Sequence, residues 1–312
     1  MRTDVDRDTT CPGPDPDPRP AVRFTVPPGA ADTHAHVVGE EFVERRSYTP
    51  PPAPGREYLR MLDATGMTYG VLVQVSVHGA DNSVMLGVLA AHRDRLRGVA
   101  VVAPDVSDTE LGRLADAGVV GLRLNTISGG GFGFDRIDRY EAICAEMGWH
   151  LQLLTSTRCL EPVASRIASL RVPVVVDHLG DVEVAEGLGQ PGWKLLLELV
   201  RDGLWTKLSG AFRLSSEPGY ADTVPFAREL AEAAPDRCVW GSDWPQVGFW
   251  GRMPNVGELL DLLADWVPDP ATRREVLTAN AHRLYGFPAR AETASPPRHR
   301  HRSPTRERRS TC

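Results

Sequence analysis

Two histidines and an aspartate supply side chains from which a hydrolytic site could be built. His34 and His36 lie two positions apart in the segment DTHAH (32–36), so an extended strand would place both imidazoles on one side. Asp243 lies far along the chain, in the segment WGSDWP (240–245). A carboxylate beside two imidazoles can deprotonate a water molecule or complete a divalent metal site. These residues therefore point to hydrolysis or metal binding, provided that the fold brings them together.

Short runs rich in Val, Leu and Ile predict the strands that must position these groups. The eight runs cover residues 31–36, 70–76, 98–103, 119–125, 149–155, 173–178, 204–209 and 238–243. Nearly continuous apolar runs are typical of parallel strands covered on both faces. Stretches with helical spacing lie between them, such as residues 82–93, 136–147 and 193–201. This order predicts a single distorted (β/α)8 barrel, a TIM barrel, which typically takes about 250 residues. An open doubly wound sheet is the alternative, but its GxGxxG motif is replaced after the first run by DTHAHVVG.

The predicted strands end in polar or ionisable side chains, at the edge where such a barrel gathers its active site. They are His34 and His36, Gln74 and Ser76, Arg123 and Asn125, Asp177 and His178, Lys207 and Ser209, and Ser242 and Asp243. Such groups cost free energy inside a protein unless they are paired or used. Because the eighth strand neighbours the first in a closed barrel, we expect Asp243 to lie beside the two histidines.

The distribution of charge separates a central body from two tails. The chain of 312 residues has a formal net charge of -6, of which residues 1–20 carry -2 and residues 291–312 carry +4, so the body carries -8. Both ends are rich in proline and polar residues, which cannot bury enough apolar surface to fold. We therefore expect disordered tails at 1–20 and 291–312 and a barrel domain at 21–290.

The same composition disfavours several classes of function. An acidic body is poor evidence of nucleic-acid binding, although the basic C-terminal tail could contact polyanions. No apolar run approaches ~18 residues, so we expect no membrane span. Five scattered cysteines without a CxxC pair, and an N-terminus without an apolar signal sequence, favour the cytoplasm. We expect a small-molecule substrate, and the sequence leaves the oligomeric state open.

The segments around the predicted strand ends resemble those of the amidohydrolase superfamily, in its amidohydrolase 2 branch. The matching segments are DTHAH, VQVS, GLRLN, WHLQL, VVVDHLGD, KLSGAFRLS, WGSDWP and NAHRLYGF, and they extend over about residues 31–288. Within that branch the chain is similar to 2-pyrone-4,6-dicarboxylate lactonases and sugar-acid lactone isomerases. The segment SVHGADNSVML (76–86) carries much of this finer likeness.

The resemblance implies a hydrolase that opens a small, carboxylated lactone by water attack at the ring carbonyl. His34, His36 and His178 would polarise that carbonyl and stabilise the oxyanion. Asp243 would act as the general base on the water and return the proton to the leaving oxygen.

The resemblance also implies residues that hold the substrate. Arg123 and Arg213 would bind a substrate carboxylate, for which the planar guanidinium group is well shaped. Ser76 and Tyr48 would hydrogen-bond to the ring. Arg123 could instead pair with a nearby Glu or Asp, and Tyr48 could be a packing residue. Asp177 is expected to orient its neighbours from beneath.

The expected cofactor follows from a departure from the superfamily. Its zinc enzymes usually take a further histidine from the fifth strand, where this chain has Gln152 and Thr155. No cofactor is therefore firmly predicted, and activity is expected to survive chelation. If a divalent ion such as zinc binds, the candidate ligands are His34, His36 and Asp243.

A second departure concerns the substrate. The stretches NTISGGGFGF (125–134) and HLGDVE (178–183) lack the basic residues of the dicarboxylate lactonases. The resemblance therefore favours a monocarboxylated or neutral lactone, with the glycines at 129–131 in a flexible lid. The alternatives are a sugar-acid lactone isomerase, a metal-dependent decarboxylase or hydrolase of the superfamily, and a catalytically idle binding protein.

Overall fold

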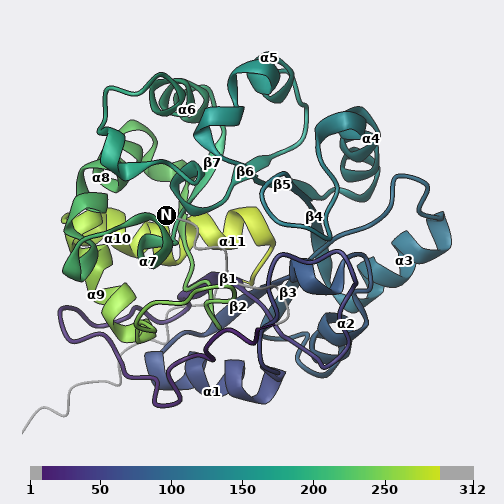
Figure 1. Cartoon of the computed structure of the whole chain (residues 1–312), viewed down its shortest axis with the longest axis horizontal. Helices are drawn as coiled ribbons and strands as arrows, with labels where there is room; N and C mark the ends of the chain where they lie inside the picture. The colour runs from purple at the N-terminus through teal and green to yellow at the C-terminus, as the bar shows by residue number, and fades with distance from the viewer. Residues whose placement is uncertain (1–8, 289–312) are drawn as a thin grey trace, which may run out of the picture.

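Eight parallel strands form a barrel with helices around it in the computed structural model, which describes residues 9–288 (Figure 1). The strands are β1 (Ala31–Ala35), β2 (Tyr69–Val73), β3 (Leu96–Ala100), β4 (Val119–Asn125), β5 (His150–Leu154), β6 (Val174–Val176), β7 (Trp205–Leu208) and β8 (Cys238–Trp240). Each strand pairs with the next along the chain, and each overlaps one of the predicted runs, although β2 and β3 begin one and two residues earlier. The predicted TIM barrel is therefore confirmed.

Helices cover the outside of the barrel. They are α1 (Gly55–Thr65), α2 (Ser83–Ala91), α3 (Asp108–Ala117), α4 (Ile137–Met147), α5 (Ala164–Ala168), α6 (Pro191–Arg201), α7 (Ala211–Leu214), α8 (Val224–Ala233), α9 (Val256–Trp266), α10 (Pro270–Leu277) and α11 (Ala279–Tyr285). The predicted helical stretches correspond to α2, α4 and α6. Within residues 9–288, no helix is both long enough and apolar enough to cross a membrane.

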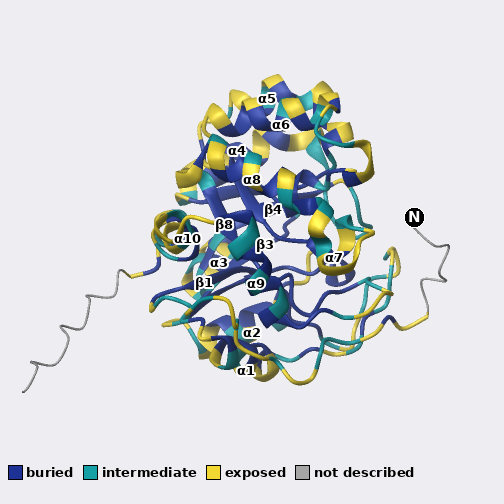
Figure 2. Cartoon of the chain, turned by 90° about the vertical axis from the view of Figure 1, so that its left-hand side faces the viewer, coloured by how far each residue is buried: buried dark blue, intermediate teal, exposed yellow. Residues whose placement is uncertain are grey.

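The core consists of a layer inside the barrel and a layer between strands and helices. Valines of neighbouring strands, such as Val71, Val99 and Val239, fill the inside, while leucines of the strands face the helices. Figure 2 shows buried strands enclosed by helices whose outer faces are exposed. In α6 the buried residues include Trp193 and Leu196, and burial of each such side chain contributes roughly 1.5–3 kcal/mol. The packed helices thus hold in place the strands whose C-terminal ends carry the polar side chains.

The backbone that follows β8 closes the barrel against β1. Ala35 and Trp244 form an isolated parallel bridge, and the Asp243 amide donates to the His34 carbonyl at 2.8 Å. The His36 amide donates to the Trp244 carbonyl at 2.7 Å. These bonds place the aspartate beside both histidines, as the closed barrel predicted.

Residues 9–20, which fall in the segment expected to be disordered, contact the barrel. Cys11 is buried and its amide donates to the Thr49 carbonyl at 2.8 Å. Asn255 donates to the Asp15 carboxylate at 3.0 Å and accepts a bond from the Arg19 amide. Residues 1–8 and the predicted C-terminal tail at 291–312 lie outside the described residues, so the domain boundaries stay a prediction.

Candidate active site

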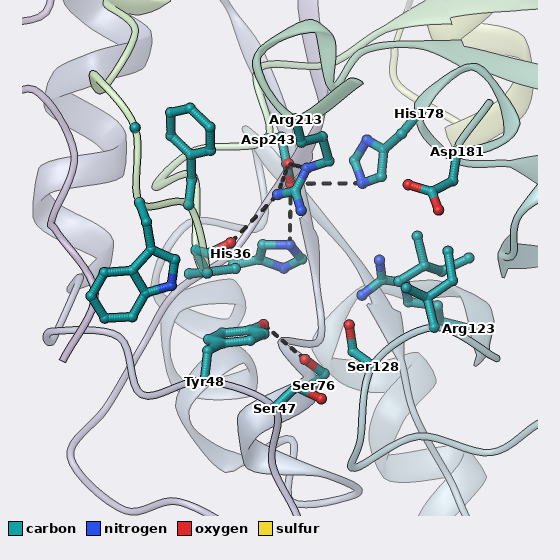
Figure 3. Close-up of a pocket in the computed structure, with 17 residues that line it drawn as sticks. His36, Ser47, Tyr48, Ser76, Arg123, Ser128, His178, Asp181, Arg213 and Asp243 are labelled. Atoms are coloured by element: carbon teal, nitrogen blue, oxygen red, sulfur yellow. Dashed lines mark hydrogen bonds and ion pairs between the residues drawn. The ribbon is translucent and has the colours of Figure 1, made fainter. Parts of the chain in front are cut away.

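The predicted site residues meet at the C-terminal ends of the strands, around a cavity of about 540 Å³ (Figure 3). This volume suits a small ligand. The predicted residues that line the cavity are Tyr48, His36, Ser76, Arg123, His178, Arg213 and Asp243. His34 is fully buried directly beneath them. The structure therefore brings the predicted residues together around one cavity.

Three imidazoles surround one oxygen of Asp243. The distances from Asp243 Oδ1 are 3.6 Å to His34 Nε2, 3.5 Å to His36 Nε2 and 3.8 Å to His178 Nε2. His36 Nδ1 lies 2.7 Å from the Val73 carbonyl, which can only accept, so Nδ1 carries a proton and Nε2 faces Asp243. The cluster therefore combines one carboxylate oxygen with three imidazole nitrogens that face it.

The same cluster has the donor atoms of a metal site. Asp243 Oδ1 and His34 Nε2 are buried and have no hydrogen-bond partner within residues 9–288. Ligand atoms of His34, His178 and Asp243 all lie within 4.8 Å of one another. Ligands about 2.1 Å from a tetrahedral zinc ion would be roughly 3.4 Å apart, and catalytic zinc sites use three protein ligands. This group could therefore hold a divalent ion, and it includes His178 where the sequence suggested His36.

The second oxygen of Asp243 is bound by Arg213, which comes from the short helix α7. Arg213 Nε and a terminal nitrogen donate to Asp243 Oδ2 at 3.0 and 2.5 Å. Burial by itself would raise the pKa of Asp243, but the charge of Arg213 and the adjacent imidazoles hold it well below its usual value. Asp243 is therefore ionised at neutral pH. The two arginine donors bind this carboxylate and not a carboxylate of the substrate.

Asp177 organises a buried layer beneath the cavity. Its Oδ2 accepts bonds from Arg123 at 3.2 Å and from Gln152 at 3.0 Å. Its Oδ1 lies 3.3 Å from His34 Nδ1. Burial opposes ionisation, yet the charges around Asp177 hold its pKa well below the usual value. Arg123 is therefore paired with Asp177, which is the alternative to substrate binding that the sequence left open.

Lys207 is a member of this layer to which sequence reasoning gave no role. Its fully buried Nζ donates to the Thr33 carbonyl at 2.9 Å and to Gln152 Oε1 at 2.8 Å, and it lies 3.2 Å from His34 Nδ1. Burial lowers the pKa of Lys207 to about 8. The sequence feature that could have identified Lys207 is its position inside an apolar run. The structure explains that position, because the lysine is the buried cation beneath His34.

Asp32 was also given no role, although it stands in the DTHAH segment. It accepts bonds from the Ser242 hydroxyl at 2.6 Å and the Ser242 amide at 2.8 Å, and burial raises its pKa to about 6. Tyr58 donates to the same carboxylate at 3.2 Å. Asp32 thus ties β1 to the residue that precedes Asp243.

The wall opposite the histidines consists of hydroxyl groups. Tyr48 and Ser76 are hydrogen-bonded to each other at 2.8 Å. The glycine run packs against this wall: a Cβ on Gly130 would lie 2.0 Å from the Ser76 carbonyl oxygen, and its φ is +89°. Glycine is therefore required there by close backbone approach and by a left-handed conformation. That residues 129–131 form a flexible lid stays a prediction.

Comparisons with known proteins show which family the chain resembles. The sequence profile of the family described as "Amidohydrolase" matches residues 31–287. The chain is 38% identical over 279 residues to 4-sulfomuconolactone hydrolase of Hydrogenophaga intermedia, covering 85% of this chain and 91% of that one. It is 34% identical over 281 residues to the 2-pyrone-4,6-dicarbaxylate hydrolase of Comamonas testosteroni, covering 84% and 92%. A crystal structure of a probable 2-pyrone-4,6-dicarboxylic acid hydrolase from Acinetobacter baumannii, with citric acid bound, superposes with a TM-score of 0.74 at 27% identity, covering 83% and 100%.

Proposed function

We propose that this chain, which belongs to the amidohydrolase family, is a hydrolase that opens a small lactone by adding water to the ring carbonyl. The observation that carries the proposal is the convergence of three imidazole nitrogens on Asp243 Oδ1 at the mouth of the barrel. The names of the hydrolase relatives point to lactone substrates. The cavity has the size of one small ring with its substituents.

Asp243 acts as the general base in this mechanism. A water molecule in the cavity beside Asp243 Oδ1 and His36 Nε2 donates a hydrogen bond to the ionised carboxylate, which turns its oxygen lone pair toward the substrate carbonyl. Asp243 takes one proton as the water oxygen bonds to the carbonyl carbon. The ring C–O bond then breaks, and the proton goes to the leaving ring oxygen, which gives an open-chain hydroxy acid or its keto form.

His178 is the imidazole best placed to stabilise the oxyanion. Its Nδ1 lies 2.9 Å from the Ser209 hydroxyl, and when that hydroxyl donates, Nε2 carries the proton and faces the cavity. Burial lowers the pKa of His178 to about 4, so it acts as a neutral donor at neutral pH. His34 Nδ1, beside Lys207 and Asp177, is held so that Nε2 points at the same place. This assigns the carbonyl-polarising role to His178 and His34 and the water-orienting role to His36.

The remaining polar groups of the cavity would bind the substrate. Arg123 keeps its guanidinium at the cavity wall while it contacts Asp177, so it can also donate to a carboxylate on the substrate. Tyr48 and Ser76 offer hydroxyls to the ring oxygens. If a divalent ion is bound, His34, His178 and Asp243 are the residues that would hold it. It would polarise the carbonyl and lower the pKa of a bound water.

A panel of carboxylated and neutral lactones tests the proposal. Hydrolysis releases one proton per turnover, which a pH-stat records, and NMR of the product shows the open chain. A changed ring without proton release would identify an isomerase instead. Inertness toward every lactone in the panel would refute hydrolysis and favour a binding role.

A further inference from the structure

Lys207 on β7 is an unusual choice of cation for this chain. The sequence has 35 lysines and arginines, of which only Lys194 and Lys207 are lysines, and Lys207 is the fully buried one. An ammonium group presents three donors from a single point, whereas a guanidinium group directs its donors into one plane. The use of lysine in a chain so rich in arginine therefore indicates that this position needs a compact group that donates in three directions.

The three donors of the Lys207 ammonium group match three acceptors. Nζ donates to the Thr33 carbonyl at 2.9 Å and to Gln152 Oε1 at 2.8 Å, and neither oxygen can donate in return. The third neighbour is His34 Nδ1 at 3.2 Å. If Nδ1 carried a proton, it would place a donor against the ammonium donor. His34 Nδ1 is therefore the acceptor of the third hydrogen bond.

Asp177 is the competing partner for the same ring nitrogen. Its Oδ1 lies 3.3 Å from His34 Nδ1 and 3.5 Å from Lys207 Nζ. This oxygen is buried and has no hydrogen-bond partner within residues 9–288, so its closeness to Nδ1 is not matched by the direction that a hydrogen bond needs. Asp177 therefore acts here through its charge, which attracts the ammonium group of Lys207.

The proton of His34 is consequently on Nε2, which faces the reacting groups. Burial and the charge of Lys207 hold the pKa of His34 well below its usual value, so the ring is neutral and carries one proton. Nε2 lies 3.6 Å from Asp243 Oδ1 and has no hydrogen-bond partner among the described residues. A buried N–H group without an acceptor costs free energy, which an oxygen of the substrate recovers when it binds there.

We propose that Lys207 is a positioning residue, which holds the proton of His34 on Nε2 so that this imidazole donates to the oxyanion formed from the lactone carbonyl. The inference rests on the lactone hydrolysis proposed above. Without the ammonium group the proton could move to Nδ1, and Nε2 would turn a lone pair toward the developing negative charge. A divalent ion at His34 Nε2 would require the loss of the same proton, so this tautomer and a bound ion exclude each other.

NMR of the wild-type protein with nitrogen-15 in its histidines measures the tautomer directly, because protonated and unprotonated ring nitrogens differ in chemical shift. His34→Gln removes the signals of His34 and so assigns them. We expect a protonated Nε2 and an unprotonated Nδ1. A proton on Nδ1 would overturn the proposal. The measurement needs no turnover, so its outcome does not depend on the proposed function.

Lys207→Met then tests the consequence for catalysis, because it removes the ammonium group and keeps the length of the side chain. Lys194→Met is the matched control, since Lys194 is exposed on α6. Circular dichroism checks that both variants fold. We expect Lys207→Met to populate the Nδ1 tautomer of His34 and to lower kcat about tenfold or more, with KM within about twofold of wild type. Lys194→Met should change none of these.

The outcomes separate the role of Lys207 from the proposed function. A folded Lys207→Met protein that keeps the wild-type kcat or the wild-type tautomer would show that the lysine does not position His34. If this variant does not fold, the tautomer of the wild type decides the question. Inertness of the wild type toward every lactone would refute the proposed function, whereas the tautomer would still show whether Lys207 sets the proton of His34.

Discussion

Replacement of Asp243 by asparagine tests the mechanism at its centre. Arg213 donates two hydrogen bonds to Oδ2, and an amide nitrogen cannot accept them. The new side chain must therefore turn its oxygen toward Arg213 and its NH2 group toward the three imidazoles. The proton acceptor is lost at the position where the proposed water is deprotonated, while the shape of the residue is kept.

The size of the effect follows from this orientation. Loss of a general base typically costs about 10²–10⁴ in rate, or roughly 3–5 kcal/mol of transition-state stabilisation. The fold should lose little, because Arg213 keeps an oxygen acceptor and is itself 28% exposed on its side chain. We therefore expect Asp243→Asn to lower kcat by at least 10² and to change the free energy of unfolding by only about 1 kcal/mol.

Proton release from a hydrolysed lactone measures kcat, and urea denaturation measures stability. Asp269→Ala is the matched control: it removes the cap of α10, where Asp269 accepts a bond from the Thr272 amide at 2.8 Å, and so costs about 1 kcal/mol far from the cavity. The control should keep the wild-type kcat. A kcat for Asp243→Asn within a few fold of wild type would refute the role of Asp243 as base.

Other changes probe the rest of the site. Arg123→Ala should raise KM for a carboxylated lactone about tenfold or more and leave KM for a neutral lactone unaffected, which steady-state kinetics on the two substrates would show. Burial lowers the pKa of His178 from 6.5 to about 4, so the folded protein binds fewer protons than the unfolded chain in that range. His178 should therefore make the free energy of unfolding fall by about 3 kcal/mol as pH drops from 6.5 to 4. Urea titrations at several pH values should show that His178→Asn removes this contribution to the pH dependence of stability. Gly130→Ala should impair activity and lower the melting temperature, because its methyl group would collide with the Ser76 carbonyl, and equal melting curves would contradict the close packing. Activity should survive dialysis against a chelator, and its loss with rescue by zinc would show that hydrolysis depends on an ion.

Much of the fold was readable from local pattern. A nearly continuous apolar run such as that of β6 cannot lie on a wet surface, so the repeated runs and amphipathic stretches predicted parallel strands covered by helices. The order of the strands then required their C-terminal ends to meet, which brought Asp243 to His34 and His36. The disorder expected for residues 1–20 is wrong for residues 9–20, because Cys11 bonds to Thr49 and Asp15 to Asn255, and composition does not reveal partners so far along the chain.

The sequence by itself determined the barrel and the edge at which its polar groups gather, because periodicity and burial act over a few neighbouring residues. Only the tertiary structure decided which charges are paired. Arg213 could have faced the substrate, yet it binds Asp243, and Lys207 became the buried cation beneath His34. These pairings join residues 30 and 173 positions apart, and their energies change when the distance between side chains from different elements of the fold changes by a few tenths of an ångström. No local pattern encodes such distances, which is why the gathering of polar side chains at one edge of the barrel was predictable and their electrostatics were not.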